Sequence, residues 1–130
     1  MGHDWQGFYA GYMTGAEGQG FAMFVFRDGV ISGTDPLGVL FDGAYSVEAH
    51  GELVGEVTVT IPPNGTVIQG VTAGPAGMEY TVPVKFGIHD FDLDYVELST
   101  PLGPINLIMR NDVTPWFPPA GIRAQQLCCA

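Results

Sequence analysis

Three aspartates at alternate positions are the first candidates for ligand chemistry. Asp90, Asp92 and Asp94 alternate with apolar residues, so on an extended strand their carboxylates would share one face. Carboxylate oxygens grouped in this way suit calcium. The EF-hand pattern fails, however, because Tyr95 stands where glycine is required and Pro101 stands where the bidentate glutamate should be. We therefore interpret the cluster as a solvated strand face and assign no metal site to it.

The histidines and cysteines also lack a metal-binding pattern. His3, His50 and His89 lie far apart, and the only cysteines, Cys128 and Cys129, are adjacent and almost terminal. Zinc sites need several Cys or His ligands at short, regular spacings, so we expect surface histidines and no metal or other cofactor. Adjacent cysteines cannot form an ordinary unstrained disulfide. The absence of a disulfide framework favours a reducing, cytoplasmic location.

No residue pattern indicates an enzyme. The sequence contains no Gly-x-Ser-x-Gly nucleophile elbow and no Cys–His pair in a catalytic context. Residues 15–20 superficially resemble a nucleotide-binding loop, but they join two strand-like runs. No helix follows whose N-terminus could face a phosphate. We therefore predict a protein that acts by binding and not by catalysis.

The charge balance limits the classes of partner. The 130 residues carry 14 acidic and 4 basic side chains, a formal net charge of −10. Nucleic-acid binding depends on clustered Lys and Arg, and here the basic residues are scattered, so we expect no direct nucleic-acid binding. An acidic surface is repelled by anionic membranes and attracts basic proteins. The sequence also shows no signal-peptide pattern and no apolar run long enough for a membrane-spanning helix. A basic protein is the expected partner.

Alternation with a period of two dominates the chain. In residues 51–61 and 78–86, apolar side chains occupy every second position and mostly polar side chains occupy the others. This pattern is typical of strands with one buried and one solvated face. Further strands are expected at residues 7–13, 20–27, 30–33, 39–47, 66–72, 91–99 and 104–110. No long segment shows a sustained helical period, so the sequence predicts eight or nine short strands and an all-β domain.

Short connections between these strands favour an up-and-down arrangement. We predict a small antiparallel, up-and-down β-barrel of about eight strands over residues 1–111. A Pro-rich C-terminal arm, extended or partly disordered, is expected over residues 112–130. Strand glycines such as Gly43 and Gly55 fit positions where a small barrel must bend. The interior of an eight-stranded barrel can be filled by side chains or can hold one small ligand.

The strand faces expected to point inward are rich in aromatic residues and methionine. Such side chains suit a malleable apolar cavity, and they equally suit a filled core. The residues expected to line the interior are Tyr9, Met23, Phe41, Tyr45, Leu53, Val57, Met78, Tyr80, Val82 and Phe86. A binding module for a small apolar ligand or lipid is therefore one candidate function. Residues 20–27 are apolar on both faces, so their outer face needs cover, and we predict a homodimer.

A series of turn glycines with flanking polar residues runs through the first half of the chain. It comprises Gly7-Phe8-Tyr9, Gly18-Gln19-Gly20, the run from Asp28 to Asp35, and Phe41-Asp42-Gly43-Ala44-Tyr45. This series resembles the GrlR-type negative regulators of type III secretion. The resemblance implies a lipocalin-like barrel that dimerises and restrains a basic helix-turn-helix transcriptional activator through an acidic surface loop.

The stretch that matches this acidic loop is residues 46–52, which carry Glu48 and Glu52. The resemblance makes these two glutamates the expected partner-binding residues. The leading interpretation is thus a non-enzymatic, cytoplasmic bacterial regulator that acts by protein–protein binding. Binding of a small apolar ligand or lipid inside the barrel is the alternative.

Overall fold

The computed structural model describes residues 4–110 of the chain. They form one antiparallel sheet of eight strands, with a three-residue 3-10 helix, Asp90–Asp92, before the seventh. The strands are β1 (Gly7–Gly15), β2 (Gly18–Arg27), β3 (Val30–Thr34), β4 (Leu40–Val47), β5 (Leu53–Ile61), β6 (Met78–Phe86), β7 (Val96–Thr100) and β8 (Gly103–Arg110). The predicted arm over residues 112–130, with Cys128 and Cys129, lies outside the described residues.

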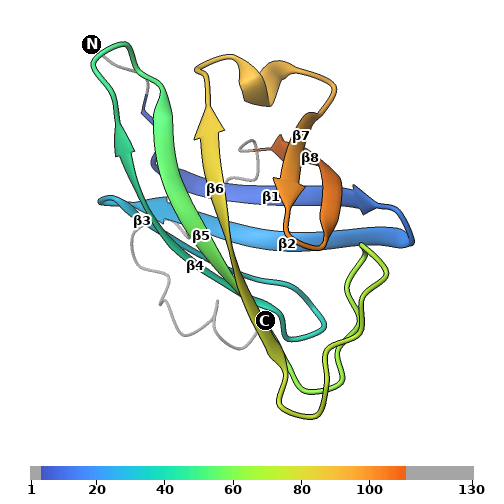
Figure 1. The fold of residues 1–130 in the computed structure, drawn as a ribbon. Helices are drawn as coiled ribbons and strands as arrows, with labels where there is room; N and C mark the ends of the chain where they lie inside the picture. The colour runs from blue at the N-terminus through green and yellow to red at the C-terminus, as the bar shows by residue number, and fades with distance from the viewer. Residues whose placement is uncertain (1–3, 111–130) are drawn as a thin grey trace, which may run out of the picture.

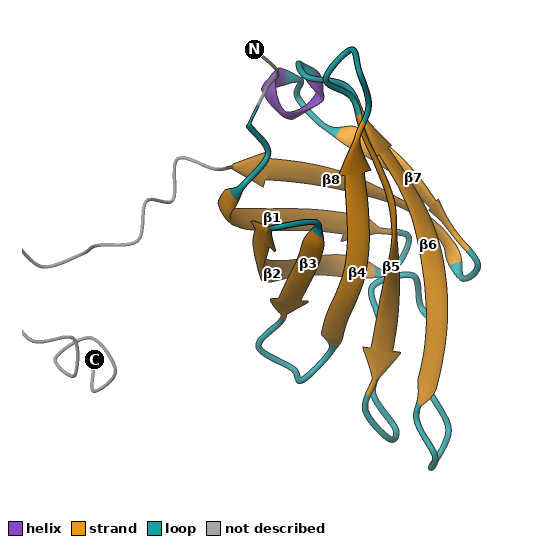
Figure 2. Cartoon of the chain, turned by 90° about the vertical axis from the view of Figure 1, so that its left-hand side faces the viewer, coloured by secondary structure: helices purple, strands orange, loops and turns teal. Residues whose placement is uncertain are grey.

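The sheet curls into a nearly closed barrel. The strand order is β6-β5-β4-β3-β2-β1-β8-β7, so every pair of neighbours except β1 and β8 is consecutive in the chain. The pairing of β1 with β8 brings the two ends of the meander together, and the edge strands β6 and β7 then lie beside each other (Figures 1 and 2). In the described residues these two strands share no ladder. The prediction of an all-β, up-and-down barrel of about eight strands is confirmed.

The turn between β2 and β3 has the backbone that its sequence requires. Asp28 and Gly29 have φ angles of 51° and 82°, both in the left-handed region. Two successive residues with positive φ are typical of the type I′ turn, whose twist matches that of the flanking strands. Asp-Gly adopts this conformation at low cost, so the sequence fixes the hairpin and the register of β3 on β2.

Alternation correctly assigns the inner face of β5 and β6, but it fails on β2. The buried residues of β2 are Ala22, Phe24 and Phe26, and Met23 lies half-buried on the outer face. The prediction that Met23 points inward is therefore wrong. Because both faces of β2 are apolar, its own sequence cannot identify the inner one. The register decides: Phe24 is paired with the inward Tyr9 of β1, and directly paired residues share a face.

Two predicted strands are loops or shorter elements. Residues 66–72 lie in the connection between β5 and β6 and contribute only an isolated bridge between Thr66 and Thr72. Residues 91–99 contain the end of the 3-10 helix and a bend before β7 begins at Val96. The three aspartates of this region therefore do not share a strand face. Asp90 instead accepts a hydrogen bond from the backbone N–H of Gly87 at 2.8 Å, which closes the turn after β6.

Aromatic side chains close one end of the barrel. Trp5 is only 2% exposed, and its indole N–H donates to the carbonyl oxygen of Gly51 at 2.8 Å. The ring of Phe91 lies 5.4 Å from that of Trp5 and 4.9 Å from that of Phe86. Tyr9 adds its ring to the cluster at 5.5 Å from Phe91. We call Trp5, Tyr9, Phe86 and Phe91 the aromatic plug. Phe86 ends β6 and Phe91 precedes β7, so the plug holds these two strands together at this end.

Two strand glycines allow β4 and β5 to approach closely. A Cβ atom at Gly43 would overlap the carbonyl oxygen of Glu56, and one at Gly55 would overlap that of Ala44. Both positions belong to the inner side of their strands, where a curled sheet is most crowded. Glycine is therefore required at these positions by space and not by backbone angle.

Substitution of Gly43 tests this packing. Gly43→Ala should lower the free energy of unfolding by about 1–3 kcal/mol, the usual cost of forcing extra atoms into a packed interior. The matched control is Gly74→Ala, because a Cβ there meets no atom within 4 Å, and its effect should stay within about 0.5 kcal/mol. Urea denaturation followed by circular dichroism measures both. Equal stability of the two variants would contradict the crowding.

Candidate functional site

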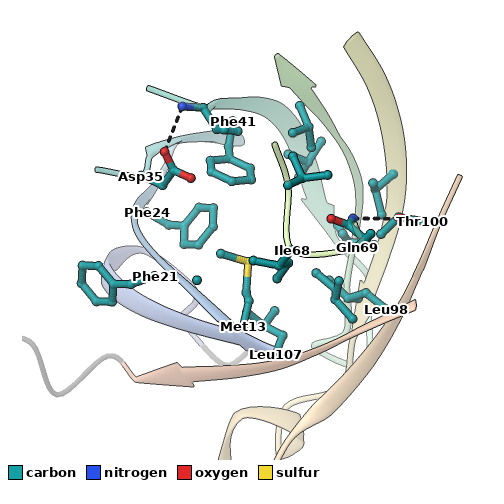
Figure 3. Close-up of a pocket in the computed structure, with 18 of the residues that line it drawn as sticks. Met13, Phe21, Phe24, Asp35, Phe41, Ile68, Gln69, Leu98, Thr100 and Leu107 are labelled. Carbon is teal, nitrogen blue, oxygen red and sulfur yellow. Dashed lines mark hydrogen bonds between the residues drawn. The ribbon is translucent and has the colours of Figure 1, made fainter. Parts of the chain in front are cut away.

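An apolar cavity lies inside the barrel, above the aromatic plug. Its volume is about 360 Å³, which falls within the usual range of roughly 300–1,000 Å³ for small-molecule sites. Phe26, Val84 and Phe86 lie at its closed end, and the loops at the opposite end of the barrel surround its mouth. Figure 3 shows Met13, Phe24 and Leu107 directed into this space. The interior is therefore not completely filled by side chains.

The residues predicted to face the interior divide into four groups. Those that line the cavity are Phe41, Val57, Tyr80, Val82 and Phe86. Tyr9 and Leu53 are fully buried outside the cavity, and Tyr45 and Met78 pack against the core without lining it. Met23 lies on the outer face of β2, as described above. The alternation thus identifies the inner faces of β4, β5 and β6, but not how far along the barrel the empty space extends.

The mouth of the cavity is formed partly by the connection between β5 and β6, residues 62–77. Val67, Ile68 and Gln69 line the cavity from this connection. The carbonyl oxygen of Ile68 accepts a hydrogen bond from the backbone N–H of Glu17 at 2.9 Å, which ties the loop to the turn between β1 and β2. The sequence does not identify these residues as part of the site. Val67 and Ile68 lie between turn-forming residues, and this pattern predicts a strand over residues 66–72 instead of a loop.

Gln69 connects the two edge strands across the mouth. Its amide Nε2 donates to the hydroxyl oxygen of Tyr80 on β6 at 3.2 Å and to Oγ1 of Thr100 on β7 at 3.1 Å. The hydroxyl of Thr100 itself donates to the carbonyl oxygen of Gly103 at 2.6 Å. Thr100 Oγ1 must therefore accept from Gln69, which fixes the orientation of the amide. Its oxygen is then turned toward the cavity, as Figure 3 shows.

The phenol of Tyr80 stays neutral at this wall. Burial raises the pKa of Tyr80 above the ordinary tyrosine value near 10, and the hydrogen bond from Gln69 opposes this shift. The hydroxyl oxygen already accepts from Gln69, so the hydroxyl hydrogen is available as a donor. Within residues 4–110, the hydroxyl makes no hydrogen bond other than the one with Gln69. The wall of the cavity therefore offers one acceptor and one donor side by side.

Asp35 places a carboxylate at the cavity mouth. Its Oδ1 accepts hydrogen bonds from the backbone N–H groups of Leu37 and Val39, each at 2.9 Å, and so shapes the loop between β3 and β4. Among the described residues that line the cavity, Asp35 and Tyr80 are the only ionisable ones. The lining therefore contains no cationic side chain that could neutralise an anionic ligand.

The predicted partner-binding residues lie at the other end of the barrel. Glu48 and Glu52 flank the turn between β4 and β5, where Nε2 of His50 is 3.1 Å from Oε1 of Glu52 and 4.0 Å from Oε1 of Glu48. Nζ of Lys85 is 3.5 Å from the same Glu52 oxygen. The hydrogen bond from His50, with Lys85 nearby, holds the pKa of the Glu52 carboxyl below its usual range against the opposing effect of desolvation. The Glu52 carboxylate is therefore ionised, and its negative charge is partly compensated by the neighbouring Lys85 ammonium group.

The same three ligand atoms, one each from Glu48, His50 and Glu52, lie within 4.8 Å of one another, which is close enough for a metal ion. The group is at the surface, however, and the ammonium group of Lys85 already contacts the Glu52 carboxylate. A cation would have to displace this ammonium group. We therefore describe the turn as an ion-pair cluster and assign no metal to it.

The outside of the barrel has two contrasting faces. Outward side chains of β1, β2 and β8 form what we call the apolar outer face, which consists of Phe8, Tyr12, Met23, Val25 and Ile108. Phe8 is 39% exposed and Tyr12 is 48% exposed. Outward carboxylates of β4, β5 and β6 form the acidic outer face, which consists of Asp42, Glu56 and Glu79.

The chain matches no protein-family model, and comparisons with curated proteins and with solved structures give no significant match. Within residues 4–110, none of the helical structure is long and apolar enough to cross a membrane. The cavity and the two outer faces are therefore the features from which a function can be argued.

Proposed function

We propose that the barrel binds a small apolar molecule in its cavity. The observation that carries this proposal is the apolar space of about 360 Å³ inside the barrel. Protein interiors are close-packed, and few contain voids larger than a water molecule. Side chains around an empty space lose their dispersion contacts on that side. An apolar occupant restores those contacts and removes its own surface from water, at roughly 25 cal/mol per Å².

The surrounding structure supports the same function. Phe86 of the aromatic plug lines the cavity at one end, and the loops over residues 35–39 and 62–77 leave it partly open at the mouth. A ligand can enter from solvent without rupture of the sheet. The strands that form the walls are held by continuous ladders from β6 round to β7. The site is thus pre-formed, which reduces the ordering cost of binding.

A cavity-filling substitution tests this proposal. Val59 lines the cavity, whereas the adjacent Thr58 faces outward on the same strand. The wild-type protein should raise the fluorescence of the neutral probe N-phenyl-1-naphthylamine, and Val59→Phe should weaken this binding about tenfold or more because the new ring occupies the cavity. Thr58→Phe adds the same ring outside and should bind as the wild type does. Circular dichroism verifies that both variants fold. The proposal is contradicted if the probe does not bind the wild type, or if it binds Val59→Phe as tightly as the wild type.

A second proposal concerns regulation through a basic protein partner. The net charge of −10, the acidic outer face and the glutamates of the turn after β4 all favour a partner of opposite charge. The resemblance of the first half of the chain to GrlR-type negative regulators suggests that this partner is a helix-turn-helix transcriptional activator. In this proposal the protein acts in the cytoplasm, restrains the activator by occupying it, and performs no catalysis.

Neutralisation of the turn tests the second proposal. The assay measures the affinity of the purified protein for a purified basic transcription factor that the wild type binds. The double variant Glu48→Gln, Glu52→Gln should bind this factor about fivefold or more weakly than the wild type does. The matched control is Asp94→Asn, Glu97→Gln, which removes the same charge from two exposed positions, one just before β7 and one within it. Equal retention by both double variants would exclude the turn as the contact. Failure of the wild type to retain any such factor would exclude the regulatory role.

A third proposal assigns the apolar outer face to a second copy of the chain. Exposed aromatic side chains on a sheet need cover, and outward positions of β1, β2 and β8 in the described structure carry no carboxylate. Two copies with a net charge of −10 repel each other overall. They meet with least repulsion through a face that carries no acid. An isologous dimer would place this face against its own copy.

Sedimentation velocity tests the dimer. The wild type should sediment as a dimer at micromolar concentration, and Tyr12→Glu should sediment as a monomer because it buries a charge in the interface. Thr81→Glu adds the same charge to an exposed outward position of β6 and should remain dimeric. A monomeric wild type, or a dimer that survives Tyr12→Glu unchanged, contradicts this use of the face.

A further inference from the structure

The wall of the cavity carries hydrogen-bonding groups that a hydrocarbon ligand could not engage. Gln69 turns its amide oxygen toward the cavity while its nitrogen is engaged with Tyr80 and Thr100. Tyr80 accepts from that nitrogen and keeps its own hydroxyl hydrogen. An acceptor and a donor therefore belong to one hydrogen-bonded pair. A group that both donates and accepts, as a hydroxyl does, can satisfy the two together.

The charges of the lining select against an anionic head group. Among the described residues, the basic side chains Arg27, Lys85 and Arg110 are all exposed on the outside of the barrel, and none lines the cavity. The Asp35 carboxylate stands at the mouth. A carboxylate ligand would lose its hydration without gaining a counter-ion, and it would meet a like charge at the mouth. A neutral head group avoids both penalties.

From these observations we infer that the cavity selects a neutral, hydroxyl-bearing apolar molecule, such as a fatty alcohol, over the corresponding carboxylate. Gln69 and Tyr80 are the specificity-determining residues, and they bind the hydroxyl. The inference rests on the proposed binding of an apolar ligand. A hydroxyl at this place reproduces the bonds that a water molecule would make with the same two residues, so its displacement of water costs little.

Three ligands of similar size test the inference on the full chain. They are 1-octanol, octanoate, and heptyl methyl ether, an isomer of 1-octanol that accepts a hydrogen bond but cannot donate one. Each competes with N-phenyl-1-naphthylamine at neutral pH. 1-Octanol should bind about fivefold or more tightly than the ether, the typical effect of one hydrogen bond. It should bind at least about tenfold more tightly than octanoate, which lacks a cationic partner.

Variants separate the hydroxyl contact from a merely structural role. Gln69→Leu removes the acceptor and should abolish the preference for 1-octanol over the ether, whereas loss of the bridge between β6 and β7 alone would weaken both ligands equally. Gln6→Leu is the matched control outside the cavity, and it should leave the preference unchanged. Asp35→Asn removes the charge but keeps an oxygen for the N–H groups of Leu37 and Val39. This variant should bind octanoate several-fold more tightly and 1-octanol as before.

Each outcome is decisive. Equal affinity of the wild type for 1-octanol and the ether, or an unchanged preference in Gln69→Leu, overturns the role of Gln69 while leaving apolar binding intact. Octanoate that binds as tightly as 1-octanol overturns the selection by charge. If neither the probe nor any of the three ligands binds, the proposed apolar-ligand function fails, and this inference fails with it.

Discussion

The barrel depends on side chains to hold together two edge strands that share no backbone ladder. β6 and β7 lie beside each other, yet in the described structure no ladder joins them. At one end the aromatic plug packs Phe86 of β6 against Phe91, which precedes β7. At the other end Gln69 donates to both Tyr80 and Thr100. The open seam of this eight-stranded sheet is thus fastened at each end by a different interaction.

These two fastenings also explain where the cavity lies. The plug packs four aromatic side chains together at its end of the barrel, whereas at the mouth Gln69 joins β6 and β7 through a hydrogen-bonded amide that lines the cavity. Valines such as Val57, Val59 and Val82 face this space, and their short side chains do not reach across it.

Much of the fold could be predicted from the sequence, and part of the site could not. The alternation in β5 and β6 and the Asp-Gly turn after β2 are local signals, and the structure agrees with them. The orientation of β2 depends on its register with β1, because its own two faces are equally apolar. Gln69 could not be identified, since its role arises from Tyr80 and Thr100, which are distant in sequence and meet only when the sheet curls. Glu48 and Glu52 are placed together by the short turn between β4 and β5, which is a local feature of the sequence. The contact of Lys85 with Glu52 arises only when β6 pairs with β5.

The two uses of Gln69 are compatible because they employ different atoms of one amide. The nitrogen fastens β6 to β7, and Thr100 compels this orientation because its own hydroxyl hydrogen is committed to Gly103. The oxygen is thereby presented to the cavity without further cost. A ligand hydroxyl that binds this oxygen does not compete with the bond that fastens the seam. Polarisation along such a chain of hydrogen bonds strengthens its members, so an occupied cavity and a fastened seam favour each other.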